Sequence, residues 1–137
     1  MKLVKRSGAR LTCAVLAAGI MIMTALGVAM GDEKKSPNPL SGDPKAIEEG
    51  QHLFRTNVCG HCHGMNARGG GRGHPMAANL QKFKRGYSAF LKTVREGYKQ
   101  MPPWGGGPQL DEETLNKIGA WLESMGQPES NWSDPRN

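Results

Sequence analysis

Two cysteines and a histidine fall within five residues near the middle of the 137-residue chain, in the order Cys59-Gly60-His61-Cys62-His63. A thioredoxin-type Cys-x-x-Cys pair would be expected in a βαβ setting, and no segment of the sequence alternates convincingly enough to be a strand. A zinc site would need four ligands in two clusters, and there is no second cysteine pair. A disulfide between Cys59 and Cys62 would be strained at so short a separation. The interpretation that remains is covalent attachment of a c-type haem, whose attachment sequence is Cys-x-x-Cys-His.

The spacing of this motif has a geometric reason. A short helical turn can carry two thiols to the two vinyl groups on one edge of a porphyrin, and the imidazole of His63 can then turn under the iron. Composition agrees, because only 37% of the residues are hydrophobic and 6% are aromatic. Such a chain buries little apolar mass by itself, and three cysteines are too few for a disulfide scaffold. We therefore predict one haem c, attached through Cys59 and Cys62, with His63 as an iron ligand.

Residues 1–30 have the layout of a secretory signal peptide. The basic start holds Lys2, Lys5, Arg6 and Arg10. An uncharged stretch, Leu11–Gly31, follows it, and the small residues Gly27-Val28-Ala29 predict cleavage after Ala29. The alternative is an uncleaved membrane anchor, since about 20 apolar residues can also span a bilayer. Either way, the rest of the chain is predicted to be exported to the periplasm.

The remaining chain is predicted to hold one domain. Residues 31–42 are rich in charged residues, Pro, Ser and Gly, and we expect them to form a flexible linker. Residues 43–126 are expected to fold as one all-α domain of three to four helices around the haem. Residues 127–137 are expected to form an irregular tail.

Three helices are predicted within the domain. The first runs from Pro44 to about Asn57, with Asp43 as its N-cap. The second is predicted over Ser88–Glu96. The third is predicted over Asp111–Met125, where Asp111 can cap the first turn and apolar residues recur every three or four positions.

The charges of the exported part are unevenly distributed. Without the four leader cations, 14 Lys and Arg residues face 12 acidic residues. Residues 55–99 hold nine cations and one acid, whereas residues 100–137 hold two cations and six acids. Nucleic acid is a poor partner for an exported domain with so few aromatic residues. A docking face for an acidic protein explains the pattern more simply, and the alternative is a set of dispersed, solvated surface charges.

The candidates for the sixth iron ligand are Met65, Met76, Met101, Met125, His52 and His74. Met101 is followed by Pro102 and Pro103 and by a glycine-rich stretch. The two prolines stiffen the segment and remove backbone donors that would need partners beside an apolar ring. A thioether held this way suits the low-spin iron of an electron carrier. We predict Met101 as the sixth ligand, with His74 and Met76 as alternatives. If Met101 does not bind the iron, the alternative explanation is that it is a buried methionine that fills a gap in the core.

From about Pro44 to Met125 the sequence resembles the small monohaem class I cytochromes c of the bacterial periplasm. The haem pentapeptide and the Met-Pro-Pro-Trp-Gly segment carry the resemblance. Gly50 and Phe54, four residues apart, match a glycine and an aromatic residue that in this family pack against a pair on the last helix, here Trp121 and Leu122. The resemblance implies the small cytochrome c fold.

The family also uses a proline carbonyl, some residues after the haem motif, to accept a hydrogen bond from the proximal imidazole. Pro75 is the only proline in the corresponding stretch, and the resemblance therefore implies that Pro75 orients His63. The sequence departs from the family pattern here, since the leucine that usually follows closely is five residues away, at Leu80. The preceding run, residues 69–73, is expected to be unusually flexible because four of its five residues are glycine.

The function implied by the resemblance is one-electron transfer through a haem ligated by His63 and Met101, without catalysis by the protein itself. The expected donor is a periplasmic dehydrogenase, such as a quinoprotein alcohol dehydrogenase, and the expected acceptor is a terminal oxidase or reductase. The protein is expected to be a monomer that meets a membrane only if its leader is uncleaved. Two alternatives remain: a fixed or anchored cytochrome subunit of a larger complex, and a haem protein with a labile sixth site that binds small ligands.

Overall fold

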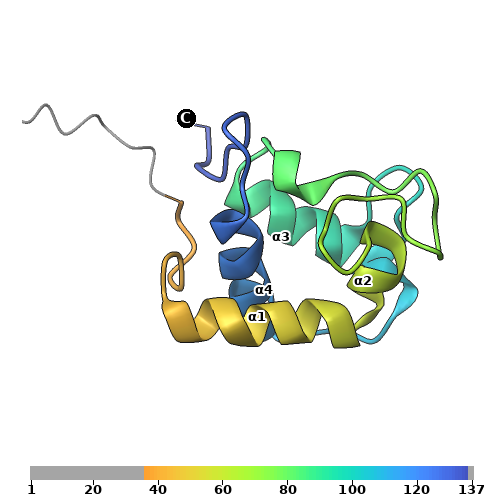
Figure 1. Cartoon of the computed structure of the whole chain (residues 1–137), viewed down its shortest axis with the longest axis horizontal. Coiled ribbons are helices and arrows are strands. Elements are labelled where there is room, and N and C mark those ends of the chain that lie inside the picture. Colours follow the sequence, from red (N-terminus) through yellow and green to blue (C-terminus); the bar gives the residue numbers. More distant parts are fainter. Residues whose placement is uncertain (1–35, 136–137) are drawn as a thin grey trace, which may run out of the picture. The chain divides into compact units, whose positions relative to one another are not determined.

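The computed structural model describes residues 36–135, and the regular elements in this part of the chain are helices (Figure 1). The elements in chain order are α1 (Pro44–Thr56), α2 (Val58–His63), the 3-10 turn η1 (Leu80–Lys82), α3 (Tyr87–Glu96), the 3-10 turn η2 (Pro103–Gly106) and α4 (Glu112–Ser124). Residues 36–135 contain no strand, only two isolated bridges. The prediction of an all-α fold is confirmed. The leader predicted for residues 1–30 lies outside the described residues.

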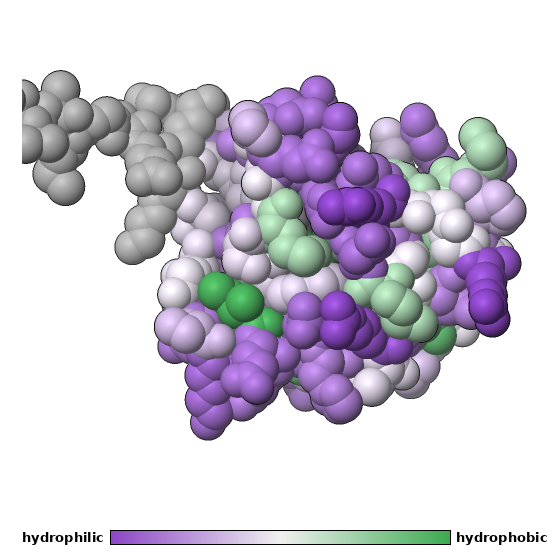
Figure 2. All heavy atoms as spheres, viewed as in Figure 1, coloured by the Kyte–Doolittle hydropathy of each residue, from purple (hydrophilic) through white to green (hydrophobic). Residues whose placement is uncertain are grey.

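The face of the molecule drawn in Figure 2 is mostly hydrophilic, with a few small and separate apolar patches. This agrees with a sequence of which only 37% is hydrophobic. Within residues 36–135, no helix is long and apolar enough to cross a bilayer.

The three predicted helices are present, and their ends follow the predicted caps. The carboxylate of Asp43 accepts a hydrogen bond from the Ala46 amide at 2.8 Å, and the carboxylate of Asp111 accepts one from the Thr114 amide at 2.7 Å. These bonds satisfy amides that the first turn of a helix leaves unpaired. The helix predicted over Ser88–Glu96 is α3, and it begins one residue earlier than predicted, at Tyr87.

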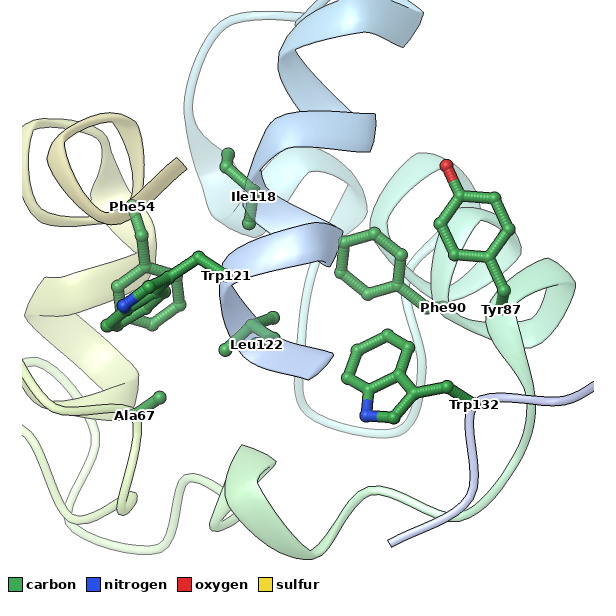
Figure 3. Close-up of a cluster of buried hydrophobic side chains, with 8 residues drawn as sticks. All are labelled: Phe54, Ala67, Tyr87, Phe90, Ile118, Trp121, Leu122 and Trp132. Atoms are coloured by element: carbon green, nitrogen blue, oxygen red, sulfur yellow. The ribbon is translucent and has the colours of Figure 1, made fainter. Parts of the chain in front are cut away.

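Helices α1 and α4 cross in close contact because a glycine stands at the crossing. A Cβ atom at Gly50 would lie 1.9 Å from the backbone oxygen of Lys117, so no other residue fits without moving a helix. One turn further along, the rings of Phe54 and Trp121 pack with their centroids 4.8 Å apart (Figure 3). Phe54, Trp121 and Leu122 are almost fully buried. The packing between the two helices that the resemblance implied is therefore present.

Residues 36–42, which we expected to belong to a flexible linker, are instead anchored to α4. The hydroxyl of Ser36 donates to Oε1 of Glu123 at 2.8 Å. The side-chain amide of Asn38 donates to the backbone oxygen of Asn116 at 3.0 Å and to the same Glu123 oxygen at 3.2 Å. Only 3% of Asn38 is exposed. The composition suggested a linker, but these specific side-chain bonds order the segment.

The segment after α4 has no helix or strand in residues 126–135, yet it also packs on the domain. The Asn131 amide donates to the Phe83 carbonyl at 2.8 Å, and the Tyr87 amide donates to the Trp132 carbonyl at 2.9 Å. The Trp132 side chain is buried against Phe83 and Phe90, at centroid distances of 4.9 and 5.5 Å. The core thus extends beyond the predicted domain end at residue 126.

Candidate functional site

The motif cysteines lie on α2, a helix of only six residues. Cys59 and Cys62 are free thiols, and both are partly buried. Burial raises the pKa of the Cys59 thiol, which keeps it protonated at neutral pH. Cys59 packs against the buried hydrophobic cluster of the domain. Two free thiols on one short helix, one of them beside apolar surface, fit the thioether attachment of an apolar ring.

His63, the last residue of α2, is oriented by a backbone carbonyl. Its Nδ1 lies 2.9 Å from the carbonyl oxygen of Ala78. A carbonyl can only accept, so Nδ1 carries the proton and Nε2 keeps a free lone pair for a metal. Burial, with a smaller contribution from nearby His74, lowers the pKa of His63 and favours the neutral form that ligates iron.

The prediction that Pro75 accepts this bond is wrong. The acceptor Ala78 stands two residues before Leu80, with which η1 begins, and three residues after Pro75. Any residue offers a backbone carbonyl, so the position in the loop decides which one reaches the imidazole. The leucine that in this family closely follows the acceptor, here Leu80, indicated the position of the acceptor better than the presence of a proline did.

A segment that we call the glycine strap, residues 69–73, runs beside α2. Three of its amides donate to the carbonyls of the last three residues of α2. Gly69 donates to His63 at 2.8 Å, Gly71 to Cys62 at 2.8 Å and Gly73 to His61 at 3.0 Å. These carbonyls have no partner within a helix that ends there. The strap therefore supplies the missing donors at the end of α2, the helix predicted to attach the haem.

The glycines of the strap are required by close approach. A Cβ atom at Gly71 would lie 2.3 Å from the His61 carbonyl oxygen. One at Gly73 would lie 2.2 Å from the His61 ring and 3.1 Å from the Cys62 sulfur. The expectation of an unusually flexible run is therefore not met, because four of its amides donate hydrogen bonds, three of them to α2, and two of its glycines touch α2.

Met101 is held in a tight turn after α3. The amide of Tyr98 donates to the Met101 carbonyl at 2.9 Å, and the amide of Met101 donates back to Tyr98 at 3.0 Å. The chain then passes through two prolines into η2. Cβ atoms at Gly105 and Gly107 would each lie 3.0 Å from the side chain of Val58, the first residue of α2. The segment that follows Met101 thus packs on α2, the helix predicted to attach the haem.

The other candidate iron ligands are distributed over several parts of the domain. His74 and Met76 belong to the loop that ends at Ala78, on the side of the His63 imidazole, and Met76 is 83% exposed. His52 is exposed on α1, and Met125 follows the last turn of α4 and packs against the core. Within residues 36–135, no three His, Cys, Asp or Glu side chains are grouped as a metal site, so a zinc centre has no ligand set there.

Comparison with known proteins gives a family match. A family model described as cytochrome c oxidase, cbb3-type, subunit III matches residues 45–122, from the first turn of α1 into α4. Among solved structures, the chain is similar to cytochrome cL of the marine methylotrophic bacterium Methylophaga aminisulfidivorans MPT, with 24% sequence identity and a TM-score of 0.48. That similarity covers 63% of this chain and 57% of the other. A search of curated proteins finds no match.

Proposed function

Because the chain belongs to the cytochrome c family of cbb3-type oxidase subunit III, whose members carry covalently bound haem c, we propose that it is a periplasmic carrier of single electrons. The observation that carries the proposal is the hydrogen bond from His63 to Ala78, which leaves Nε2 free on the helix that also presents Cys59 and Cys62. The haem would supply the Fe(III)/Fe(II) couple. The protein attaches the ring, fixes the iron ligands and presents an edge to partners.

We propose His63 and Met101 as the two axial ligands. Ala78 orients the imidazole of His63, and the turn with Tyr98 and two prolines hold the backbone of Met101. Ligands fixed in this way need not move when the charge on the iron changes, which favours fast electron exchange. A His/Met pair also raises the reduction potential.

The redox partners are proposed from the loop sequence and the leader. The leader would be cleaved after Ala29, which releases a periplasmic protein. The Met-Pro-Pro-Trp segment resembles the loops of cytochromes that serve quinoprotein alcohol dehydrogenases. We therefore propose such a dehydrogenase as the electron donor and a terminal oxidase or reductase as the acceptor.

An acidic docking partner is supported by the charges that remain after ion pairing. Three cations of residues 55–99 have acidic partners, as in the Lys82–Glu129 pair at 2.9 Å. Within residues 36–135, the six cations without one are Arg55, Arg68, Arg72, Lys84, Arg85 and Lys99. Tyr98, which is 46% exposed, has the Arg85 guanidinium 4.2 Å and the Lys99 ammonium 5.4 Å from its ring centroid. This basic cluster stands next to the Met101 turn.

The docking proposal predicts an electrostatic rate effect. Changing Lys84 and Arg85 to Gln should slow reduction by the cognate dehydrogenase about tenfold at low salt, because steering accelerates encounter. Changing Lys82 and Glu129 together to Gln is the matched control, since the ion pair that these two residues form carries no net charge. The difference should vanish near 1 M salt, where the Debye length is ~3 Å. A rate that is indifferent to salt and to the double substitution would contradict a basic docking face.

Carbon monoxide tests the carrier function itself. If Met101 occupies the sixth position, the reduced wild-type protein should resist the gas, whereas Met101→Ala should bind it readily. Rapid binding by the wild type would favour the labile-site alternative over an electron carrier.

A second candidate is a fixed subunit of a redox complex, because the matching family is described by an oxidase subunit. Cell fractionation separates the two functions. A periplasmic carrier is released with the soluble fraction after osmotic shock, whereas a fixed subunit stays with the membranes and copurifies with its complex.

A further inference from the structure

The turn that holds Met101 has a strained backbone. Tyr98 and Met101 pair through two backbone hydrogen bonds, at 2.9 and 3.0 Å, so Lys99 and Gln100 form the two-residue loop between them. Lys99 has a φ of +54°, in the left-handed region that disfavours residues with a side chain. A two-residue turn with a positive φ at its first position usually has glycine there. Other contacts must therefore keep this turn closed.

Burial does not provide these contacts. A hollow of about 440 Å³ borders the turn, and the residues that line it are those of the turn and its flanks, 96–103. Tyr98 is 46% exposed, and the side chains of Lys99 and Gln100 are exposed as well. The loop of the turn is thus held by what its own side chains touch at the surface.

The ring of Tyr98 makes two such contacts. The Arg85 guanidinium lies over this ring, 4.2 Å from its centroid, and the ammonium of the strained Lys99 lies 5.4 Å from it. A cation over the face of an aromatic ring is attracted by the negative charge of the π system. The contact with Lys99 lies within the turn, whereas the contact with Arg85 ties the turn to the segment that precedes α3.

Arg85 is itself held in place. Its Nη1 donates to the hydroxyl of Thr93, on the last turn of α3, at 3.3 Å. The Thr93 carbonyl accepts from the amide of Gly97, where α3 ends, at 3.0 Å. Beside Arg85, the amide of Gly86 donates to the Asn131 carbonyl at 3.2 Å, which fixes the backbone to the segment after α4. The guanidinium therefore connects an ordered part of the fold to the turn.

We propose that Arg85 is a positioning residue for Met101: its stack on the Tyr98 ring keeps the turn closed and so keeps the thioether on the iron. The inference rests on the proposed function, because it takes Met101 as the sixth ligand. Lys84 carries the same charge one residue earlier and has no aromatic ring beneath it in residues 36–135. The two neighbouring cations are therefore expected to differ in their effect on the iron.

Imidazole tests the proposal, because it competes with Met101 for the oxidised iron and its apparent affinity reports how firmly the thioether is held. Arg85→Gln should raise the association constant of imidazole about twofold to fivefold, which converts to about 0.5–1 kcal/mol, the strength of an exposed cation–π contact. Lys84→Gln is the matched control, since it removes the same charge without a stack, and should leave the constant unchanged. Equal constants for these two variants overturn the proposal.

Two substitutions of Tyr98 test the role of the ring. Tyr98→Leu should raise the imidazole constant at least as much as Arg85→Gln, whereas Tyr98→Phe keeps the aromatic face and should keep the wild-type value. Adding Arg85→Gln to Tyr98→Leu should have no further effect, because Arg85 acts through the ring. Additive effects, or equal constants for Tyr98→Phe and Tyr98→Leu, overturn the proposal.

Met101→Ala separates a failure of this proposal from a failure of the proposed function. If the wild type binds imidazole as tightly as Met101→Ala does, Met101 is not a ligand, and the ligand assignment and the role of Arg85 are both overturned. If the wild type binds imidazole more weakly than Met101→Ala and Arg85→Gln matches the wild type, only the role of Arg85 is overturned.

Discussion

Gly71→Ala tests whether the glycine strap holds the end of the haem-attachment helix. The added methyl group would lie 2.3 Å from the His61 carbonyl oxygen and 2.6 Å from that of Cys62, so the strap must move away from α2. The movement breaks up to three amide–carbonyl bonds, of 2.8, 2.8 and 3.0 Å. At about 1 kcal/mol net for each bond, the expected loss of unfolding free energy is about 3 kcal/mol.

Gly70→Ala is the matched control in the neighbouring position. Its Cβ atom would have only the Pro75 carbonyl oxygen nearby, at 3.6 Å, and the only cost is the positive φ of +63°. That strain amounts to about 1 kcal/mol. Denaturant unfolding of the holoprotein, followed by tryptophan fluorescence, measures both variants. The strap argument is refuted if Gly71→Ala is no less stable than Gly70→Ala.

Three further changes test the fold and the attachment site. Gly50→Ala should cost about 3 kcal/mol or more in thermal or denaturant unfolding, because its methyl group would lie 1.9 Å from the Lys117 oxygen; an unchanged midpoint would contradict the crossing of α1 and α4. The hydrogen bond from the Thr114 amide lowers the pKa of Asp111, so the Asp111 carboxylate stabilises the folded protein at neutral pH and loses this effect as pH falls below 3.8 through the folded-state pKa. The stability difference between the wild type and Asp111→Asn should therefore shrink over that range. A difference that stays constant with pH would contradict this cap. Single Cys59→Ser or Cys62→Ser should lower the yield of covalent haem, and the double variant should lack compact structure by circular dichroism and size exclusion.

The sequence predicted the helices well because their signals are local. Asp43 and Asp111 are N-caps that bond to amides three residues on, and the apolar spacing of α4 repeats over a few turns. The haem pentapeptide is equally local. For this reason the all-α class, the three main helices and the haem c cofactor could be predicted without coordinates.

The features that were missed depend on contacts between distant residues or on backbone atoms. Asn38 bonds to Asn116, 78 residues away, and Trp132 packs on Phe83, so neither segment could be recognised as ordered from its composition. The acceptor for His63 is a carbonyl, which any residue has, and a proline in the neighbourhood was therefore misleading. A run of glycines can be flexible, or it can allow the backbone to approach another element closely. Only the structure, in which the strap lies against α2, shows that the glycines serve close approach here.

The far-red absorption of the oxidised protein reports whether Met101 completes a His/Met-ligated iron. Sulfur-to-iron charge transfer gives a weak band in this region only when a thioether is bound. The wild type should show the band, Met101→Ala should abolish it, and Met76→Ala, which changes an 83% exposed side chain, should leave it unchanged. A band that survives in Met101→Ala and disappears in Met76→Ala would show that Met76, and not Met101, is the sixth ligand.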